Sequence, residues 1–283
     1  MWIANRTEGT VSRLDARTGH VLVTIRIGDP ARLHPNCEVD YDDSPAGTFL
    51  IRRCDLPSAL AVGAGAVWVG RNDTLSVVRI DPATNRVVAS IPVGVHIFGL
   101  AASDSAVWVS AYEDDRLVRI DPGTNAVSLD LPLPHGPSGI ATDGDKAWAV
   151  AYRGSSVSAI DGASGHVQRT IPVGWQPFPI AVSNGSAWVR NEGDASLSRI
   201  AVASGTVVAT VPIDAFTGTD GIDSLAVTDK GIWIGGQRLQ RVDPSSNRVV
   251  ESLPFEGRPV TAGDGTLWVI GISGLILHID PRR

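Results

Sequence analysis

Short runs of apolar residues alternate with clusters of Gly, Asp, Ser, Asn and Pro along the chain, and the same order returns every 40 residues. Each run has the length and the Val, Ile and Leu content of a β-strand, and the clusters between the runs are typical of turns. The clearest copy has its four runs at 98–102, 107–111, 116–120 and 126–131. A tryptophan lies in the second run of four successive copies, at Trp68, Trp108, Trp148 and Trp188.

Looser copies surround Trp2, Trp233 and Trp268, which brings the number of copies to seven. A period of about 40 residues with four short strands predicts an all-β fold, namely a seven-bladed β-propeller of four-stranded antiparallel blades. Because one continuous repeat forms the ring, we expect residues 1–283 to be a single β-propeller domain.

Both terminal copies are incomplete. The first copy lacks its first strand and begins in mid-repeat, so we expect an upstream piece to be absent from the numbered chain. The last copy lacks its fourth strand. A six-bladed ring with spare terminal strands is the alternative, and residues 47–53 could supply a missing strand.

Thirteen residues after their tryptophans, four copies have an aspartate that opens a turn: Asp15, Asp81, Asp121 and Asp161. Repeated acids could indicate metal sites, but an aspartate at the start of a turn hydrogen-bonds its own backbone, and we interpret these residues as turn residues. Ala201 takes the position in the fifth copy, which predicts a looser turn there. The tryptophans are predicted to fill the space between adjacent blades.

One stretch, 29–55, interrupts the repeat as an inserted loop and carries both cysteines, Cys37 and Cys54. The two thiols either form a disulfide or stay reduced. A disulfide favours a periplasmic or extracellular location, and reduced thiols favour the cytoplasm. Without a companion set of Cys and His residues, a zinc site is not expected.

The loops of the predicted ring fall on two rims. Turns between first and second strands, and between third and fourth strands, share one rim and are nearly uniform. Loops between second and third strands, and between blades, share the other rim and differ from copy to copy. Function is usually carried by variable loops on a regular scaffold. We therefore predict a site for a small molecule or a peptide or protein partner on this rim, with ligand-binding residues Arg6, Arg71, Tyr112, Tyr152, Trp175, Arg190 and Arg258. The opposing interpretation is a solvated rim with weak ion pairs.

His96 and His135 lie in adjacent inter-blade loops of this rim, and Glu192 lies in a second-to-third loop. Two imidazoles and a carboxylate could act as a general base or bind a divalent cation, with Mg²⁺ or Ca²⁺ as candidates for an otherwise unknown cofactor. These three residues are the candidate catalytic residues, although no established catalytic motif surrounds them.

Charge and hydropathy exclude two classes of partner. The net charge is −6, and no Lys/Arg cluster exists beyond two Arg pairs, so nucleic acid is not an expected partner. No apolar run approaches the roughly 18 residues needed to span a membrane.

The copy at 66–94, AVWVGRNDTLSVVRIDPATNRVVASIPVG, contains the motifs R-I-D-P-x-T-N-x-V and I-P-V-G. These motifs resemble those of the YVTN-type β-propeller repeat family, relatives of NHL-repeat propellers, and the likeness extends from Trp2 to Arg283 outside the insertion. The resemblance implies the fold and leaves the activity open. Similar propellers include bacterial surface, periplasmic and sensor proteins, and virginiamycin B lyase-like enzymes, which open a lactone ring by metal-assisted elimination using His and Glu. We favour a binding or interaction protein, with a metal-assisted lyase or lactone hydrolase as the alternative.

Overall fold

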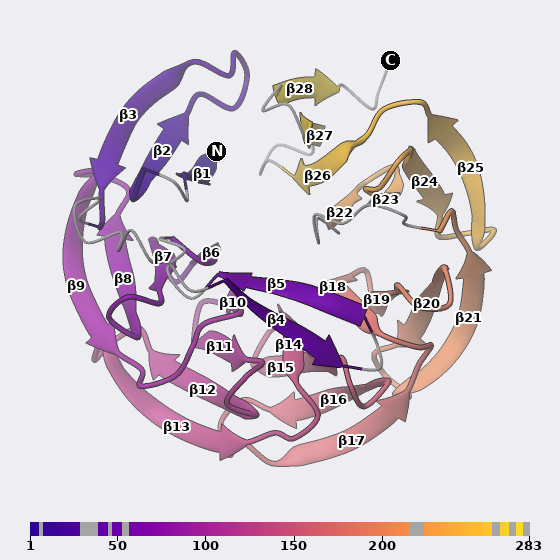
Figure 1. The fold of residues 1–283 in the computed structure, drawn as a ribbon, viewed down its shortest axis with the longest axis horizontal. Coiled ribbons are helices and arrows are strands. Elements are labelled where there is room, and N and C mark those ends of the chain that lie inside the picture. Colours follow the sequence, from indigo (N-terminus) through magenta and orange to yellow (C-terminus); the bar gives the residue numbers. More distant parts are fainter. Residues whose placement is uncertain are drawn as a thin grey trace.

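The computed structural model describes residues 1–5, 8–28, 39–44, 47–52, 57–215, 224–261, 267–271 and 276–279. Every regular element in these residues is a β-strand. Seven antiparallel sheets stand around a common axis as the blades of a ring, and the strands of each blade run in chain order from the axis outward (Figure 1).

Five blades have four strands each. Blade 2 consists of β6 (Leu60–Gly63), β7 (Ala66–Arg71), β8 (Ser76–Asp81) and β9 (Arg86–Pro92). Blade 3 consists of β10 (Gly99–Ala102), β11 (Val107–Ala111), β12 (Arg116–Asp121) and β13 (Ala126–Pro132). Blade 4 consists of β14 (Pro137–Asp143), β15 (Lys146–Ala151), β16 (Ser156–Asp161) and β17 (Val167–Pro172). Blade 5 consists of β18 (Pro177–Ser183), β19 (Ser186–Asn191), β20 (Ser196–Ala201) and β21 (Thr206–Pro212). Blade 6 consists of β22 (Leu225–Thr228), β23 (Gly231–Ile234), β24 (Leu239–Asp243) and β25 (Arg248–Leu253).

The terminal blades have three described strands each. Blade 1 consists of β1 (Trp2–Asn5), β2 (Thr10–Leu14) and β3 (Val21–Arg26), and blade 7 of β26 (Gly257–Thr261), β27 (Leu267–Gly271) and β28 (Ile276–Ile279). The predicted all-β, seven-bladed propeller is confirmed, and the six-bladed alternative is wrong. β4 (Val39–Ser44) and β5 (Gly47–Arg52) pair with each other as a separate hairpin, so residues 47–52 do not supply a blade strand.

The hydrophobic core lies between the blades. Six clusters of buried apolar side chains each join two neighbouring blades, from blades 1 and 2 round to blades 6 and 7. Trp108 is 1% exposed and shares a cluster with Ile140 and Ala147 of blade 4. The predicted place between blades is confirmed for the five most deeply buried tryptophans, Trp68, Trp108, Trp148, Trp188 and Trp233, whereas Trp2 is only partly buried.

Arginines opposite the tryptophans tie certain blades together. In blade 2, Arg79 pairs across the strands with Trp68, and its Cζ lies 5.0 Å from the indole centroid. The Nη1 atom of Arg79 donates hydrogen bonds to the carbonyl oxygen of Pro122 at 2.7 Å and to Oδ1 of Asn125 at 2.8 Å, both in the β12–β13 turn of blade 3. Equivalent bonds link Arg13 to blade 2 and Arg199 to blade 6. The Asp-Pro-x-x-Asn turn is thus also the acceptor of the preceding blade's arginine.

The two interfaces of blade 4 lack this bond. Its β16–β17 turn has Gly162 and Gly165 at the positions of the proline and the asparagine. Arg119 of blade 3 instead bonds within its own blade, to Oγ of Ser128 at 2.7 Å and to the carbonyl oxygen of Ser105 at 3.0 Å. On the other side of blade 4, Ala159 stands opposite Trp148, and the interface with blade 5 is apolar.

The turn aspartates bond as expected of turn residues. Asp121 Oδ1 accepts the N–H groups of Gly123 at 2.7 Å and Thr124 at 3.0 Å. Ala201 has no carboxylate, yet its turn closes with the same Gly205 N–H to Ala201 carbonyl bond of 2.8 Å that closes the Asp161 turn, so the predicted looser turn is wrong. Five such aspartates have a lowered pKa because turn hydrogen bonds favour the charged form, chiefly from backbone N–H groups at Asp15, Asp81 and Asp121 and from serine hydroxyls at Asp161 and Asp243.

Acid should therefore destabilise the ring through these turns. A carboxylate with a lowered folded-state pKa stabilises the fold above its unfolded pKa of about 4 and loses that contribution as the pH falls through the folded-state pKa. We expect the melting temperature to drop between about pH 4 and pH 2, and the Asp121→Asn variant to show a shallower drop than the wild type. Circular dichroism melts across this range measure both. An Asn variant with an equally steep drop would contradict the assignment for this turn.

Candidate functional site

The loop rim, formed by the second-to-third loops and the inter-blade loops, has a regular backbone and variable side chains. In blades 2 to 5 each second-to-third loop ends in a residue with positive φ, whose carbonyl oxygen accepts an N–H from the inter-blade loop that follows the same blade: Leu75, Asp115, Ser155 and Ala195. Blades 2 to 5 therefore share the same loop backbone at this rim and differ in their side chains.

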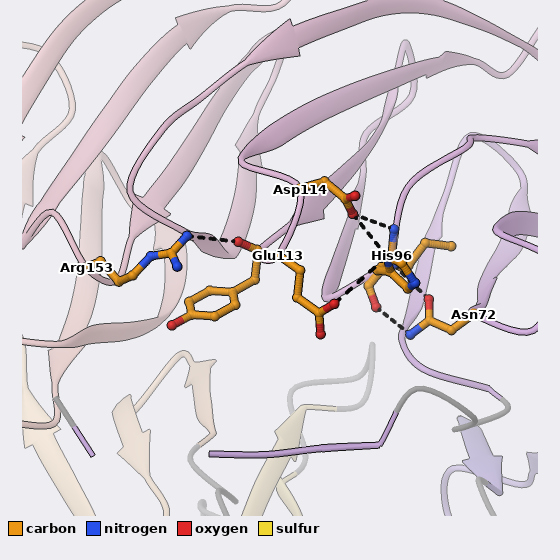
Figure 2. A network of polar contacts seen from close by, with 7 residues as sticks. Asn72, His96, Glu113, Asp114 and Arg153 are labelled. Carbon is orange, nitrogen blue, oxygen red and sulfur yellow. Dashed lines mark hydrogen bonds and ion pairs between the residues drawn. The ribbon is translucent and has the colours of Figure 1, made fainter. Parts of the chain in front are cut away.

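His96 is held from two blades. The backbone of the adjacent Ile97 donates its N–H to Oδ1 of Asn72 at 2.8 Å and accepts Nδ2 of Asn72 at 3.2 Å, which ties the loop to blade 2. On the other side, the N–H of His96 donates to Oδ2 of Asp114 in blade 3 at 2.7 Å. Its Nδ1 lies 3.4 Å from the same oxygen and 3.9 Å from Oε2 of Glu113 (Figure 2). The imidazole thus lies beside two carboxylates.

An aromatic cluster lies beside this loop. The ring centroid of Phe98 lies 5.4 Å from that of Tyr112 in its own blade and 5.6 Å from that of Phe178 in blade 5. Tyr112 in turn lies 6.0 Å from Tyr152 of blade 4. Edge and tilted contacts of this kind stabilise aromatic clusters. Because Phe98 is 39% exposed, the cluster has an accessible ring.

A serine in blade 4 explains how rings of blades 3 and 5 can meet. In blades 3, 4 and 5 an alanine of the first strand pairs with the tryptophan of the second strand. Three positions before this alanine the blades have Phe98, Ser138 and Phe178, respectively. The small side chain of Ser138, which is buried, leaves room that a third ring would occupy. Phe98 and Phe178 are not among the residues predicted for the site, although both occupy the same position of their repeats.

Arg153 fixes the tyrosine side of the cluster. Its Cζ lies 4.9 Å from the Tyr112 ring centroid, within cation–π distance. Its Nη2 donates to Oδ1 of Asp115 at 2.8 Å, and the same carboxylate oxygen accepts the N–H of Gly136 at 2.7 Å. Tyr112 and Tyr152 are buried, so both lie beneath the exposed part of the cluster.

Trp175 is 51% exposed but fixed in place. Its N–H donates to Oδ2 of Asp194, and its carbonyl oxygen accepts the N–H of Gly193 at 3.1 Å. A Cβ atom on Gly193 would lie 2.3 Å from the indole, so the ring fits over this backbone because the residue is glycine. The indole is an ordered apolar surface, as the prediction of a ligand-binding Trp175 requires.

The remaining predicted residues occupy several environments. Arg71 forms a bidentate pair with Asp73, with the closer contact at 2.7 Å. Arg190 is 2% exposed, and its Nη1 donates to the carbonyl oxygen of Gly235 in blade 6 at 2.6 Å, which suits a positioning role. Arg258 lies in β26, and its side chain is outside the described residues, as are Arg6, Cys37 and Cys54.

The three candidate catalytic residues stand on successive blades. His96 precedes β10, His135 is exposed and precedes β14, and Glu192 follows β19 with its N–H bonded to the carbonyl oxygen of Gln176 at 3.0 Å. The described contacts join His96 to Glu113 and Asp114 instead of to His135. Across the described part of the chain, no group of three or more His, Cys, Asp or Glu side chains is arranged to hold a metal ion.

No protein-family model and no curated protein sequence matches the chain. Solved structures match its shape. Kuenenia stuttgartiensis hydrazine synthase is 18% identical, with a TM-score of 0.57, over 80% of this chain and 66% of that chain. A streptogramin B lyase structure is 16% identical, with a TM-score of 0.63, over 78% of this chain and 82% of that chain. The dihydro-heme d1 dehydrogenase NirN in complex with DHE is 14% identical, with a TM-score of 0.68, over 99% of this chain and 60% of that chain.

These likenesses show the fold: the chain is a β-propeller. It spans about two thirds of the hydrazine synthase chain and 60% of the NirN chain. In the described residues no helix is long and apolar enough to cross a membrane.

Proposed function

We propose that the protein is a binding β-propeller that holds a small molecule or a peptide on the loop rim of blades 3 to 5. The observation that carries the proposal is the contact of Phe98 and Phe178 across blade 4, with one of the rings partly exposed. Exposed, ordered aromatic side chains beside charged groups are typical of recognition surfaces, because they offer apolar contact at a small entropic cost.

The polar groups around the rings would set the orientation of the ligand. Glu113, Asp114 and His96 lie on one side of the cluster and Arg153 on the other, so a ligand with groups of both charges suits the rim. The repeat motifs also support membership of the YVTN-type propeller family, which we propose for this chain on its R-I-D-P-x-T-N and I-P-V-G sequences.

A ligand screen followed by two substitutions tests the binding site. Compounds and peptides that quench the tryptophan fluorescence of the wild type but not that of Trp175→Ala, or that raise the melting temperature, identify ligands. We expect Phe98→Ala and Trp175→Ala each to weaken binding by about 10- to 30-fold, because truncating a central aromatic contact costs roughly 1.4–2 kcal/mol. The matched control is Val88→Ala, since Val88 is exposed on the outer strand β9 and should leave affinity unchanged. Equal affinity of all three variants for every ligand would contradict this site.

The second candidate is a lyase or lactone hydrolase, and the pairing of His96 with Asp114 favours it. If Nδ1–H of His96 donates to this carboxylate, Nε2 is free to remove a proton from a substrate. The described side chains do not form a donor set for Mg²⁺ or Ca²⁺. Cyclic esters are the substrates to screen. Turnover that survives in His96→Ala would contradict this candidate.

A further inference from the structure

Two arginines of the loop rim, in blades 2 and 4, already have carboxylate partners. Arg71 forms a bidentate pair with Asp73, and Nη2 of Arg153 donates to Oδ1 of Asp115 at 2.8 Å. A neighbouring carboxylate cancels most of the attraction that an arginine would exert on an anion. The positive group of a ligand is therefore the one for which the rim has unmatched partners.

Those partners are Glu113 and Asp114 of blade 3, which have no arginine or lysine beside them among the described residues. Their described neighbour of opposite charge is His96, which is charged only when protonated and whose Nδ1 lies 3.9 Å and 3.4 Å from their carboxylates. Figure 2 shows both carboxylates toward this imidazole and Arg153 on the other side of the loop. Their side chains are 23% and 29% exposed, so water would screen an ion pair with a ligand less than at a fully exposed carboxylate.

The two exposed aromatic side chains of the described rim lie in loops that such carboxylates hold. Phe98 follows His96, whose N–H donates to Oδ2 of Asp114 at 2.7 Å. Trp175 donates its own N–H to Oδ2 of Asp194, for which the described residues provide no ion-pair partner. An aromatic face beside a carboxylate binds ammonium and guanidinium groups, because the ring and the charge both attract a cation.

A buried hydroxyl beneath the rings has no hydrogen-bond partner. Ser138 is 1% exposed, and its Oγ is unpaired. Because Ser138 occupies in blade 4 the position that Phe98 and Phe178 occupy in blades 3 and 5, its side chain faces the place where these two rings meet. A ligand N–H group seated between the rings would supply the missing partner.

A second buried polar atom without a partner lies at the Trp175 loop. Asn191 is 0% exposed, and its Nδ2 donates to Oγ of Ser196 and of Ser198, each at 2.9 Å, whereas its Oδ1 accepts no bond. A Cβ atom on Gly174 would collide with both Asn191 and Asp194, so the two side chains converge beside Trp175. An amide oxygen and a carboxylate are both acceptors, so this position also suits a donor.

We propose that the ligand of the loop rim carries an ammonium or guanidinium group on an apolar body. The inference rests on the proposed function and adds the charge that the site selects. The apolar body lies on Phe98, and the cation lies at the carboxylates of Glu113 and Asp114. In a longer ligand, a second N–H donor lies at Trp175 and Asp194. A free amine and a lysine or arginine side chain of a peptide share this chemistry.

Three compounds that share a phenyl ring and differ in charge test the inference: 2-phenylethylamine, 2-phenylethanol and 3-phenylpropionate. In calorimetric titrations of the full chain, we expect the amine to bind about tenfold more tightly than the alcohol or the acid, because only the amine pairs with the carboxylates. The end-blocked tripeptides Gly-Phe-Lys and Gly-Phe-Arg separate the two sources of the cation. Tighter binding of a tripeptide assigns the cation to a peptide side chain, and tighter binding of the amine assigns it to a small molecule.

Single substitutions locate the cation. Glu113→Gln and Asp114→Asn should each weaken the amine about 3- to 10-fold and leave the alcohol unchanged, because each removes a charge and keeps the shape of the side chain. Asn at position 114 still has an oxygen to accept the N–H of His96. The matched control is Asp130→Asn, which removes one charge from the same blade at a carboxylate already paired with Arg116 and should leave the amine affinity unchanged.

The outcomes separate this inference from the binding site itself. If the alcohol or the acid binds as tightly as the amine and Phe98→Ala weakens all three, the aromatic site stands and the cationic ligand is overturned. Amine binding that is insensitive to Phe98→Ala would contradict the proposed site, and this inference with it. An equal effect of Asp130→Asn and Glu113→Gln would overturn the inference too, since net charge would then explain the affinity. The same holds if neither the amine nor the tripeptides approach saturation at about 10 mM.

Discussion

Trp108→Ala should destabilise the ring by about 3–5 kcal/mol, the range for removing a buried aromatic side chain from a packed core. The indole is 1% exposed and lies between blades 3 and 4, so its removal leaves a cavity that touches two blades. Urea denaturation followed by circular dichroism measures the change. Trp175→Ala is the matched control, since an exposed indole on the loop rim should change stability by less than about 0.5 kcal/mol. Equal losses in the two variants would show that the buried tryptophans do not hold the blades together.

Arg79→Met should lower the free energy of unfolding by about 2 kcal/mol. The substitution leaves the side chain of Asn125 and the carbonyl of Pro122 without their charged donor, and it removes the cation over the Trp68 ring. Arg119→Met is the control with the same residue type at the same position of the next blade. Its hydrogen bonds are exposed and stay within blade 3, so we expect a loss below about 1 kcal/mol.

The difference between these two variants is the informative quantity. If Arg79→Met and Arg119→Met lose equal stability by urea denaturation, the bond from one blade to the turn of the next contributes nothing measurable. A double variant with Asn125→Ala separates the pair, because a shared interaction makes the losses of Arg79→Met and Asn125→Ala less than additive.

The fold could be predicted from the sequence because the same local pattern of strand and turn residues recurs in every copy of the repeat. A tryptophan in the second strand, a turn aspartate thirteen residues later and alternating apolar runs fix strand number and register without knowledge of distant contacts. The turn at Ala201 shows the limit of this reading: the backbone of the strands around it closes the turn even without the capping carboxylate.

The candidate site was predicted in part. The rim and Trp175 followed from loop variability, whereas Phe98 and Phe178 depend on where blades 3 and 5 meet, which no local pattern encodes. Likewise, the hydrogen bond from Arg79 to Asn125 joins residues that are 46 positions apart, so it can be predicted only once the placement of one blade against the next is known. The contact of His96 with Asp114 also joins two different loops of the rim, so the sequence pattern around either residue does not predict it.

The missing arginine bonds on both sides of blade 4 have a mechanical consequence. Both of its interfaces contain an apolar cluster and lack the arginine-to-turn hydrogen bonds that join blades 1 to 2, 2 to 3 and 5 to 6. Under mild denaturant, these two interfaces should loosen before the interfaces of blades 1 and 2, 2 and 3, and 5 and 6. Since Phe98 and Phe178 contact each other across blade 4, a ligand bound on those rings would stabilise both interfaces of this blade.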